Sequence, residues 1–312
     1  MSKIHAPKSG KPIENEYIRF DQLSALIIDD ISAMRHAIRS QLESIGMHAI
    51  TVVANAPDAL TQIKLNKFDF ILCDYNLNQT NSGQHFLEYL RTENILSATT
   101  LFVMLTAETE YSFVANAVEF LPDDYLLKPC PETKLRLRLE RLIDRRAYLM
   151  PVLKAFDAGR YDVAINVCNK LLAMSPDDRR VIEVLKRKSD AQFNLGEVTE
   201  VLETLKQAAL IRPDTPWIML GRARAHFALG DLAQAAEIAH ELIEKNKNFV
   251  AAYELLAKIR LESSDDEGAF DLLSRSSEIL PSAKRFRSVS QAAFLLGKLN
   301  EAKLHSEGAI RL

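Results

Sequence analysis

Short apolar runs, each followed at once by charged or polar residues, recur along the first half of the chain. Runs that are this brief and end this abruptly are typical of strands buried in a parallel sheet. The segments between them have helical spacing, and Gly46 marks the end of the first helix. This alternation predicts a doubly wound α/β fold with a five-stranded parallel sheet. The predicted strands are residues 23–30, 48–53, 70–74, 101–105 and 124–127.

The predicted helices set the domain organisation. A long helix begins near Pro131 and has no internal Gly or Pro before Pro151, which we expect to break or kink it. We place a domain boundary there, with a stiff helical connection. The expected parts are a flexible arm over residues 1–21, an α/β domain over 22–149 and a second domain over 150–312. The other helices are predicted at 32–45, 57–65, 83–91 and, with a weaker pattern, 110–120.

Functional groups follow four of the predicted strands, namely Asp29 with Asp30, then Asp74, Thr106 and Lys128. Because parallel strands end at the same edge of a sheet, we expect these side chains to gather there. Three carboxylates held together repel one another, and Mg²⁺ relieves such repulsion through oxygen ligands. The pattern predicts a Mg²⁺ site beside a nucleophilic Asp74.

In this order, the residues resemble the receiver domain of two-component response regulators. The resemblance covers residues 23 to about 148 and rests on Asp29-Asp30, Asp74, Thr106-Ala107, Tyr125 and Lys128-Pro129. It implies a flavodoxin-like fold in which Asp74 accepts a phosphoryl group from a sensor histidine kinase or a phosphotransfer protein.

The resemblance also implies a ligand set for Mg²⁺. Asp30, Asp74 and the backbone carbonyl of Asn76 would bind the ion directly, and Asp29 would act mainly through water. The loop after Asp74 departs from the family, since it carries Leu77-Asn78 and a polar insert at 79–81 where Met-Pro is usual. The geometry of this loop therefore stays open.

The resemblance implies that the remaining family positions contact the phosphoryl group or respond to it. Lys128 would pair with one phosphoryl oxygen, and the Thr106 hydroxyl would donate to another. Inward movement of Thr106 would let the Tyr125 ring turn from exposed to buried, and Lys128-Pro129 is a candidate cis peptide. The alternatives are a purely packing role for Tyr125 and a receiver that keeps the fold without phosphorylation.

The second half of the chain is repetitive. One sequence frame recurs at intervals of 33 to 37 residues, and a proline follows three of the turn positions after 17 residues. This resembles tetratricopeptide repeats, with about five units over 145–312 and the first overlapping the end of the preceding helix. Turn positions are Gly159, Gly196, Gly230, Ser264 and Gly297; buried small positions are Ala164, Ala235, Ala269 and Ala302; the prolines are Pro176, Pro213 and Pro281.

Stacked helix pairs form a superhelix with a concave groove that usually binds peptides or protein segments. A shift of the frame by two residues would place Trp217 in the packing core, so core packing remains the alternative for the aromatic candidates. The candidate groove residues are Lys186, Phe193, Trp217, Arg224, Phe227 and Lys258.

Basic residues on the helix after Pro131 raise the question of nucleic acid. We interpret them as a solvated face or as partners of Glu132, Glu140 and Asp144, because no aromatic residues interleave with them. A net charge of −3 and the lack of a recognition-helix unit after the receiver also argue against DNA binding. The basic residues are Lys134, Arg136, Arg138, Arg141, Arg145 and Arg146.

Composition places the protein in the cytoplasm. Its three cysteines lack metal-like spacing, and an odd number argues against a disulfide framework. No apolar run approaches the roughly 20 residues of a membrane span, and the N-terminus lacks the apolar core of a secretion signal.

We therefore expect a response regulator that signals through protein contacts. In this hypothesis, phosphorylation of Asp74 controls what the repeats bind; the alternative is a phosphate sink or shuttle whose repeats only dimerise or localise the protein. Catalysis would be limited to the receiver's own phosphoryl transfer and dephosphorylation. The last repeat reaches Leu312 without a polar capping helix, so we expect either further chain or the second subunit of a homodimer to cover it.

Overall fold

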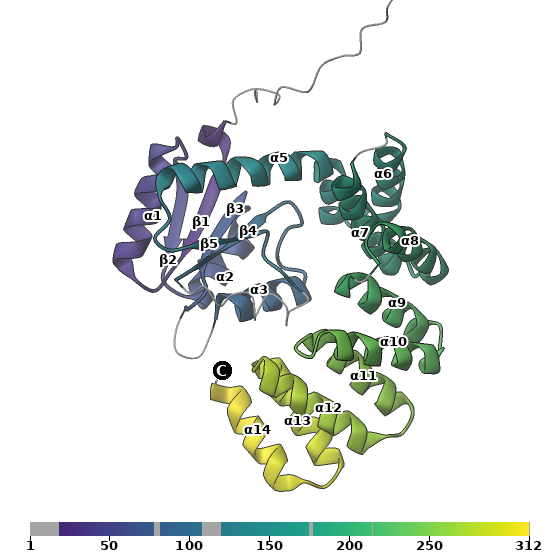
Figure 1. The fold of residues 1–312 in the computed structure, drawn as a ribbon. Coiled ribbons are helices and arrows are strands. Elements are labelled where there is room, and N and C mark those ends of the chain that lie inside the picture. Colours follow the sequence, from purple (N-terminus) through teal and green to yellow (C-terminus); the bar gives the residue numbers. More distant parts are fainter. Residues whose placement is uncertain (1–18, 78–81, 108–119, 175–176, 214, 312) are drawn as a thin grey trace, which may run out of the picture.

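A parallel sheet and a curved stack of helices make up the computed structural model (Figure 1). The structure describes residues 19–77, 82–107, 120–174, 177–213 and 215–311. The sheet has the strand order β2-β1-β3-β4-β5, and every neighbouring pair is parallel. This confirms the predicted five-stranded fold. The strands are β1 (Ser24–Ile28), β2 (Ala49–Val53), β3 (Phe70–Asp74), β4 (Leu101–Thr106) and β5 (Asp124–Leu127).

Helices cover both faces of the sheet. On one face, α1 (Ser32–Ser44) and α5 (Glu132–Asp157) pack on alternate strand residues such as Ile27 and Leu72. On the other face, α2 (Ala56–Leu65) and α3 (Gly83–Thr92) pack on the intervening residues. Both faces are buried, which explains why the central strands are apolar without interruption. The helix predicted over 110–120 lies mostly outside the described residues.

The last residues of the predicted N-terminal arm belong to the α/β domain. A 3₁₀ turn spans Phe20–Gln22, and the Phe20 ring is buried in the core beneath α1 and α5. Residues 19–21 therefore belong to the α/β domain, whereas residues 1–18 lie outside the described part of the chain.

Helix α5 does not break at Pro151. It continues to Asp157, with Pro151 on its exposed side. Its first half packs on the sheet, and its second half packs against the first repeat through Val152 and Leu153. The boundary predicted at residue 149 thus falls inside one helix that both domains share.

Some basic residues of α5 have ion-pair partners other than those expected. Arg136 pairs with a predicted partner, Glu140, whereas Arg138 pairs with Asp124 and Arg145 with Glu183. Arg146, predicted to lie on the outer face, is buried. Its guanidinium donates to the carbonyls of Ala98 and Thr100 and pairs with Asp123.

The second half of α5 and the described residues after it form a solenoid. Helices α5 to α14 pair in it as successive helical hairpins, as predicted. All five predicted turn positions have positive φ, including Ser264 at 60°. The predicted small positions are buried between the paired helices, while Pro176 lies outside the described residues. The helices are α6 (Tyr161–Ala173), α7 (Asp178–Leu195), α8 (Val198–Ile211), α9 (Pro216–Ala228), α10 (Leu232–Lys245), α11 (Val250–Glu262), α12 (Asp266–Ile279), α13 (Ala283–Leu295) and α14 (Leu299–Arg311).

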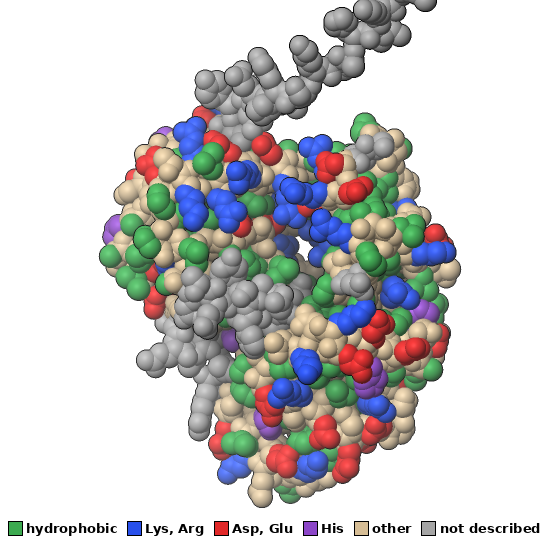
Figure 2. All heavy atoms as spheres, viewed as in Figure 1, with side chains coloured by type: hydrophobic (Ala, Val, Ile, Leu, Met, Phe, Trp, Pro, Cys, Tyr) green, Lys and Arg blue, Asp and Glu red, His purple; other side chains and the backbone are tan. Residues whose placement is uncertain are grey.

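The solenoid curves back toward the α/β domain, so that α13 lies near α3 (Figure 1). Basic side chains gather around the hollow between the two domains (Figure 2). Among the described helices, none combines the length and the apolar character needed to cross a bilayer. The last helix pair exposes Phe294, Leu295 and Leu299, and what covers them stays a prediction.

Candidate functional site

Three acids meet at the carboxyl edge of the sheet, as their positions after β1 and β3 predict. Ligand atoms of Asp29, Asp30 and Asp74 all lie within 4.8 Å of one another. Asp29 and Asp74 are buried, whereas Asp30 is exposed. The backbone N–H of Ile31 donates to Asp29 at 2.9 Å and holds its carboxylate in place.

Lys128, which follows β5, reaches the same acids. Its ammonium lies 2.6 Å from Asp29 Oδ2 and 2.9 Å from Asp74 Oδ2. The Lys128-Pro129 peptide bond is cis, in agreement with the resemblance. Lys128 thus brings one positive charge to a cluster of three carboxylates, which leaves the site with a negative surplus that a cation can balance.

The groups around Asp74 have opposite effects on the pKa of its carboxyl group. Burial is the main cause of a raised pKa, the neighbouring Lys128 lowers that pKa, and the charge of Asp29 raises it. The backbone N–H of Asn76 donates to Asp74 and favours the charged form. Helix α3 begins directly against the backbone of Asp74, since a Cβ on Gly83 would come within 2.2 Å of the Asp74 carbonyl oxygen. That position therefore requires glycine.

The donor set fits Mg²⁺. Carboxylates from two strands offer hard oxygen atoms, and the exposed side of Asp30 leaves room for the waters that Mg²⁺ retains. Asn76 is exposed beside Asp74, and the role of its backbone carbonyl as a further Mg²⁺ ligand stays a prediction. Cys73 is buried behind Asp74, and burial raises the pKa of its thiol well above the usual value, which suits a core residue.

Thr106 and Tyr125 lie on the adjacent strands β4 and β5. Thr106 ends β4 and is buried, and its carbonyl accepts from the Lys128 backbone N–H at 2.7 Å. Tyr125 is half-buried, and its hydroxyl lies 3.5 Å from Oε1 of Gln84 in the first turn of α3. The fully buried Gln84 also donates to the carbonyl of Phe120. Sequence reasoning missed Gln84, because a single polar residue on a helix carries no motif.

Five of the six candidate groove residues line two neighbouring cavities between the domains. Phe193 and Arg224 border both, Lys258 borders one, and Lys186 and Trp217 border the other. The Lys186 ammonium lies 5.7 Å from the centre of the Trp217 ring. Phe227 borders neither cavity and instead packs against the core of the middle repeats, which is the alternative that its position left open.

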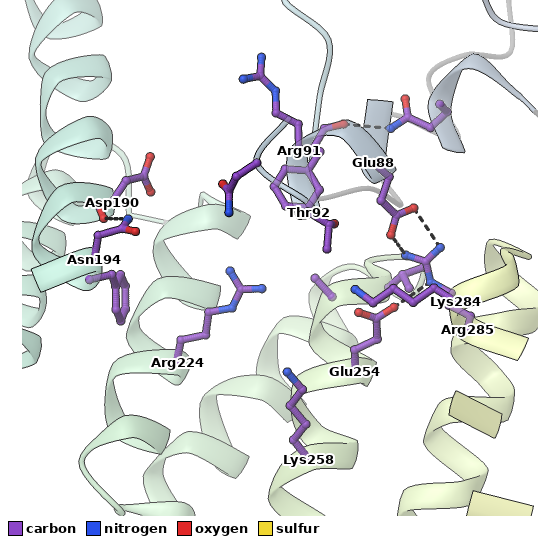
Figure 3. Close-up of a pocket in the computed structure, with 16 residues that line it drawn as sticks. Glu88, Arg91, Thr92, Asp190, Asn194, Arg224, Glu254, Lys258, Lys284 and Arg285 are labelled. Atoms are coloured by element: carbon purple, nitrogen blue, oxygen red, sulfur yellow. Dashed lines mark hydrogen bonds and ion pairs between the residues drawn. The ribbon is translucent and has the colours of Figure 1, made fainter. Parts of the chain in front are cut away.

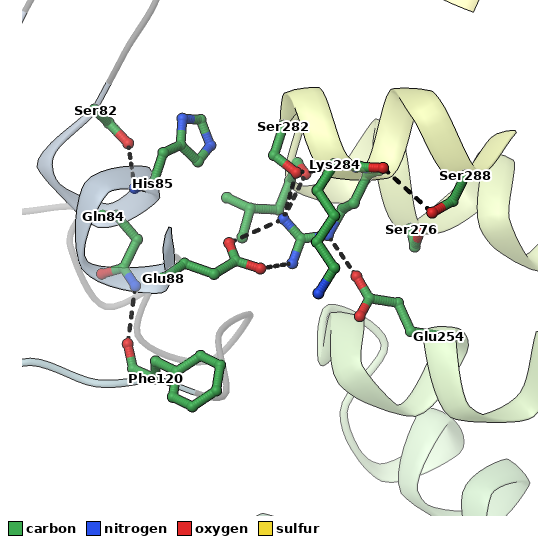
Figure 4. A network of polar contacts seen from close by, with 12 residues as sticks. Ser82, Gln84, His85, Glu88, Phe120, Glu254, Ser276, Ser282, Lys284 and Ser288 are labelled. Carbon is green, nitrogen blue, oxygen red and sulfur yellow. Dashed lines mark hydrogen bonds and ion pairs between the residues drawn. The ribbon is translucent and has the colours of Figure 1, made fainter. Parts of the chain in front are cut away.

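An ion-pair cluster joins the two domains at the far end of the solenoid. Arg285 of α13 donates to Glu88 of α3 at 2.5 and 3.1 Å and to Glu254 of α11 at 2.8 Å. Figure 4 shows Glu88 and Glu254 reaching the same guanidinium from opposite domains. The Arg285 side chain is only 6% exposed. We call Glu88, Arg285 and Glu254 the interdomain clasp; no local sequence pattern indicates it.

A second attachment lies at the start of the solenoid. Asp157, at the end of α5, accepts from Ser97 Oγ at 2.5 Å and from Thr99 Oγ1 at 3.0 Å, both in the loop before β4. The backbone N–H of Ala98 donates to the same carboxylate. The solenoid is therefore fixed to the α/β domain at both of its ends.

Comparisons with known families define the class of protein. Residues 25–140 match the response regulator receiver domain, and residues 195–259 match the tetratricopeptide repeat. The chain therefore contains a receiver domain followed by a tetratricopeptide repeat region, which confirms the resemblance inferred from the sequence.

Particular relatives match one domain each. Chemotaxis protein CheY-3 of Vibrio cholerae serotype O1 is 26% identical over 130 residues, covering 42% of this chain and 98% of that protein. CheY of Pseudomonas aeruginosa is also 26% identical, over 123 residues that cover 39% of this chain and 98% of that protein.

Solved structures also resemble single domains. MamA is 19% identical and covers 51% of this chain and 92% of its own, with a TM-score of 0.43. CheY4 of Vibrio cholerae is 24% identical, and the match covers 38% of this chain and 98% of that chain, with a TM-score of 0.35.

Proposed function

We propose that the protein is a phosphorylation-controlled adaptor: Asp74 accepts a phosphoryl group, and the repeats bind a protein partner in response. The observation that carries the proposal is the gathering of Asp29, Asp30, Asp74 and Lys128 at one sheet edge. The receiver family supports a histidine kinase or phosphotransfer protein as the donor. The free thiols of the chain favour the cytoplasm as its compartment.

In the proposed reaction, a carboxylate oxygen of Asp74 attacks the phosphorus of a phosphohistidine. A P–O bond forms while the P–N bond breaks, and its electron pair returns to the imidazole. Bound Mg²⁺, held by Asp30, Asp74 and Asn76, would neutralise phosphoryl charge. Lys128 is positioned beside Asp74 to pair with a phosphoryl oxygen, and Thr106 stands at the neighbouring strand end to donate to another. Later attack by water would release phosphate, and no other catalysis is proposed.

Helix α3 supplies a route from the acceptor to the solenoid. Its first residue, Gly83, packs on the Asp74 backbone, Gln84 contacts Tyr125, and Glu88 joins the clasp about one turn further on. Phosphorylation replaces the single negative charge of the Asp74 carboxylate by roughly two on the aspartyl phosphate. We propose that the resulting shift in Tyr125 and α3 changes the clasp and thereby the opening of the repeats.

The test uses acetyl phosphate with Mg²⁺ and intact-mass spectrometry. We expect a hydroxylamine-labile phosphoryl adduct on the wild-type chain and none on Asp74→Asn, whose side chain is nearly isosteric. A Glu140→Gln variant, on the exposed side of α5, serves as the folding control. An adduct of equal yield on Asp74→Asn would refute the assignment of the acceptor.

A second measurement separates the adaptor from the phosphate sink. Hydrogen exchange of α3 and α13 is compared before and after phosphorylation. Faster or slower exchange at α13 supports control of the repeats, whereas an adduct on Asp74 that leaves both helices unchanged would favour the sink.

A further inference from the structure

A cavity of about 510 Å³ lies between the receiver and the inner side of the solenoid. Its receiver wall is the α3 surface around Glu88 and Arg91, and its solenoid wall carries Arg224, Lys258 and Lys284 from α9, α11 and α13. We call it the junction cavity. Because the clasp forms part of its lining, the cavity exists in this shape only while the two domains stay in contact.

Cations dominate the charge that the junction cavity offers to a ligand. Five cations and three acids line the cavity, and Arg285 offsets part of the charge of Glu88 and Glu254, so the lining keeps a formal surplus of two positive charges. Lys258 and Lys284 have no hydrogen bond or ion pair to any described residue through their side chains. Figure 3 shows Arg224, Lys258 and Lys284 extending into the space beneath α3 from three different helices.

Arg91 adds a charge from the receiver side. Burial lowers the pKa of its guanidinium to about 10, although the charge of Asp123 raises it. Within the described residues, the Arg91 side chain has no hydrogen-bonded partner. A partly desolvated cation is costly unless an anion pairs with it, so a ligand carboxylate at this wall would be favoured.

The other lining groups identify the kind of anion. The side-chain amides of Asn94 and Asn194 border the cavity, with one N–H of Asn194 engaged by the Asp190 carbonyl, and amides both donate and accept, as an extended peptide backbone requires. An adjoining cavity of about 470 Å³ adds the rings of Phe193 and Trp217. A formal surplus of two positive charges is small for a nucleic-acid strand, whose affinity depends on the neutralisation of several phosphates. The lining suits carboxylates spaced along a peptide with an apolar side chain.

We propose that the junction cavity binds an acidic peptide segment of a partner protein, with the receiver helix α3 as one wall of the site. Lys258 and Lys284 pair with its carboxylates on the solenoid side, and Arg91 does so on the receiver side. This inference deepens the proposed adaptor function and rests on it, because it names the chemistry of the partner that the repeats take.

The test measures fluorescence anisotropy of a fluorescein-labelled glutamate decapeptide with one central phenylalanine, added to the full chain. We expect saturable binding, weakened about tenfold by the double variant Lys258→Glu and Lys284→Glu. Arg91→Gln should also weaken binding, which a groove formed by the repeats alone would not show. The matched control is Lys206→Glu, since Lys206 is an exposed helical lysine that borders neither cavity.

Three results would overturn the inference: equal binding of a glutamine decapeptide, equal losses in the double variant and the control, or tighter binding of a thymidine decanucleotide. Formation of the Asp74 adduct is measured on the same samples. Adduct without peptide binding refutes the acidic site and leaves the receiver chemistry standing. Peptide binding without adduct refutes the receiver chemistry instead.

Discussion

The interdomain clasp predicts a specific cost for separating the two domains. Glu88→Gln removes one charge from α3 and keeps the side-chain shape. In the wild-type protein, Glu88 accepts two hydrogen bonds from Arg285. Both side chains are largely buried, with 15% of Glu88 and 6% of Arg285 exposed. A hydrogen bond that involves a charged group contributes about 1.5–3 kcal/mol to stability.

Glu254 limits this cost. In Glu88→Gln the Arg285 guanidinium still pairs with Glu254 at 2.8 Å, so no buried charge is left alone. The larger penalty of about 3–5 kcal/mol for an orphaned buried charge therefore does not apply to the single variant. We expect the free energy of domain separation to fall by about 1.5–3 kcal/mol, which favours the open form by about 10- to 150-fold.

Native-state hydrogen exchange of α13 measures this change, and small-angle scattering measures the accompanying increase in the radius of gyration. The double variant Glu88→Gln with Glu254→Gln should lose more than the sum of the two single variants, because they share one partner. Glu140→Gln removes an i,i+4 ion pair on the receiver half of α5. It should change the opening free energy of α13, measured by hydrogen exchange, by less than about 0.5 kcal/mol. Unchanged exchange of α13 in Glu88→Gln would refute the reasoning.

Three further outcomes follow from local structure. Ser264→Gly should raise the free energy of unfolding by about 0.5–1 kcal/mol in urea titrations, because Ser264 has a φ of 60°, and Gly230→Ser should lower it by about 1 kcal/mol. Cys130, half-buried, should react with a thiol reagent before Cys168, since burial raises the pKa of Cys168 to about 12 and keeps the thiol protonated. Lys128→Ala should retain Mg²⁺ binding by calorimetry but form less phosphoryl adduct.

The sheet and its acidic edge were predictable because their signals are local. An apolar strand buried on both faces ends at the edge of the sheet, and its last residue then lies at that edge, as Asp74 does at the end of β3. The repeat frame was predictable for a similar reason: each turn needs positive φ, and four of the five positions are glycine. Ser264 was assigned to a turn although it is not glycine, because its spacing from the other turn positions was sufficient to predict it.

The contacts between the domains were not predictable from local patterns. Arg285 and Glu88 are 197 residues apart, and each is an ordinary charged residue on an amphipathic helix. Pro151 failed as a helix breaker because the solenoid buries Val152 and Leu153 beside it, so tertiary packing outweighs the lost backbone hydrogen bond. Arg146 was assigned to a solvated face for the same reason: nothing in its neighbours along the chain indicates the carbonyls that it meets across the fold.

Both attachments of the solenoid contact the receiver near α3, so the proposed communication between the two domains needs no flexible linker. At one end, Asp157 holds the loop that connects α3 to β4; at the other, Arg285 holds α3 itself. A movement of α3 relative to the sheet would therefore strain one attachment or release the other. Since Gly83 packs on the backbone of Asp74, the end of α3 nearest the acceptor is the place where such a movement would begin. The junction cavity lies between the two attachments, so its shape depends on the same helix.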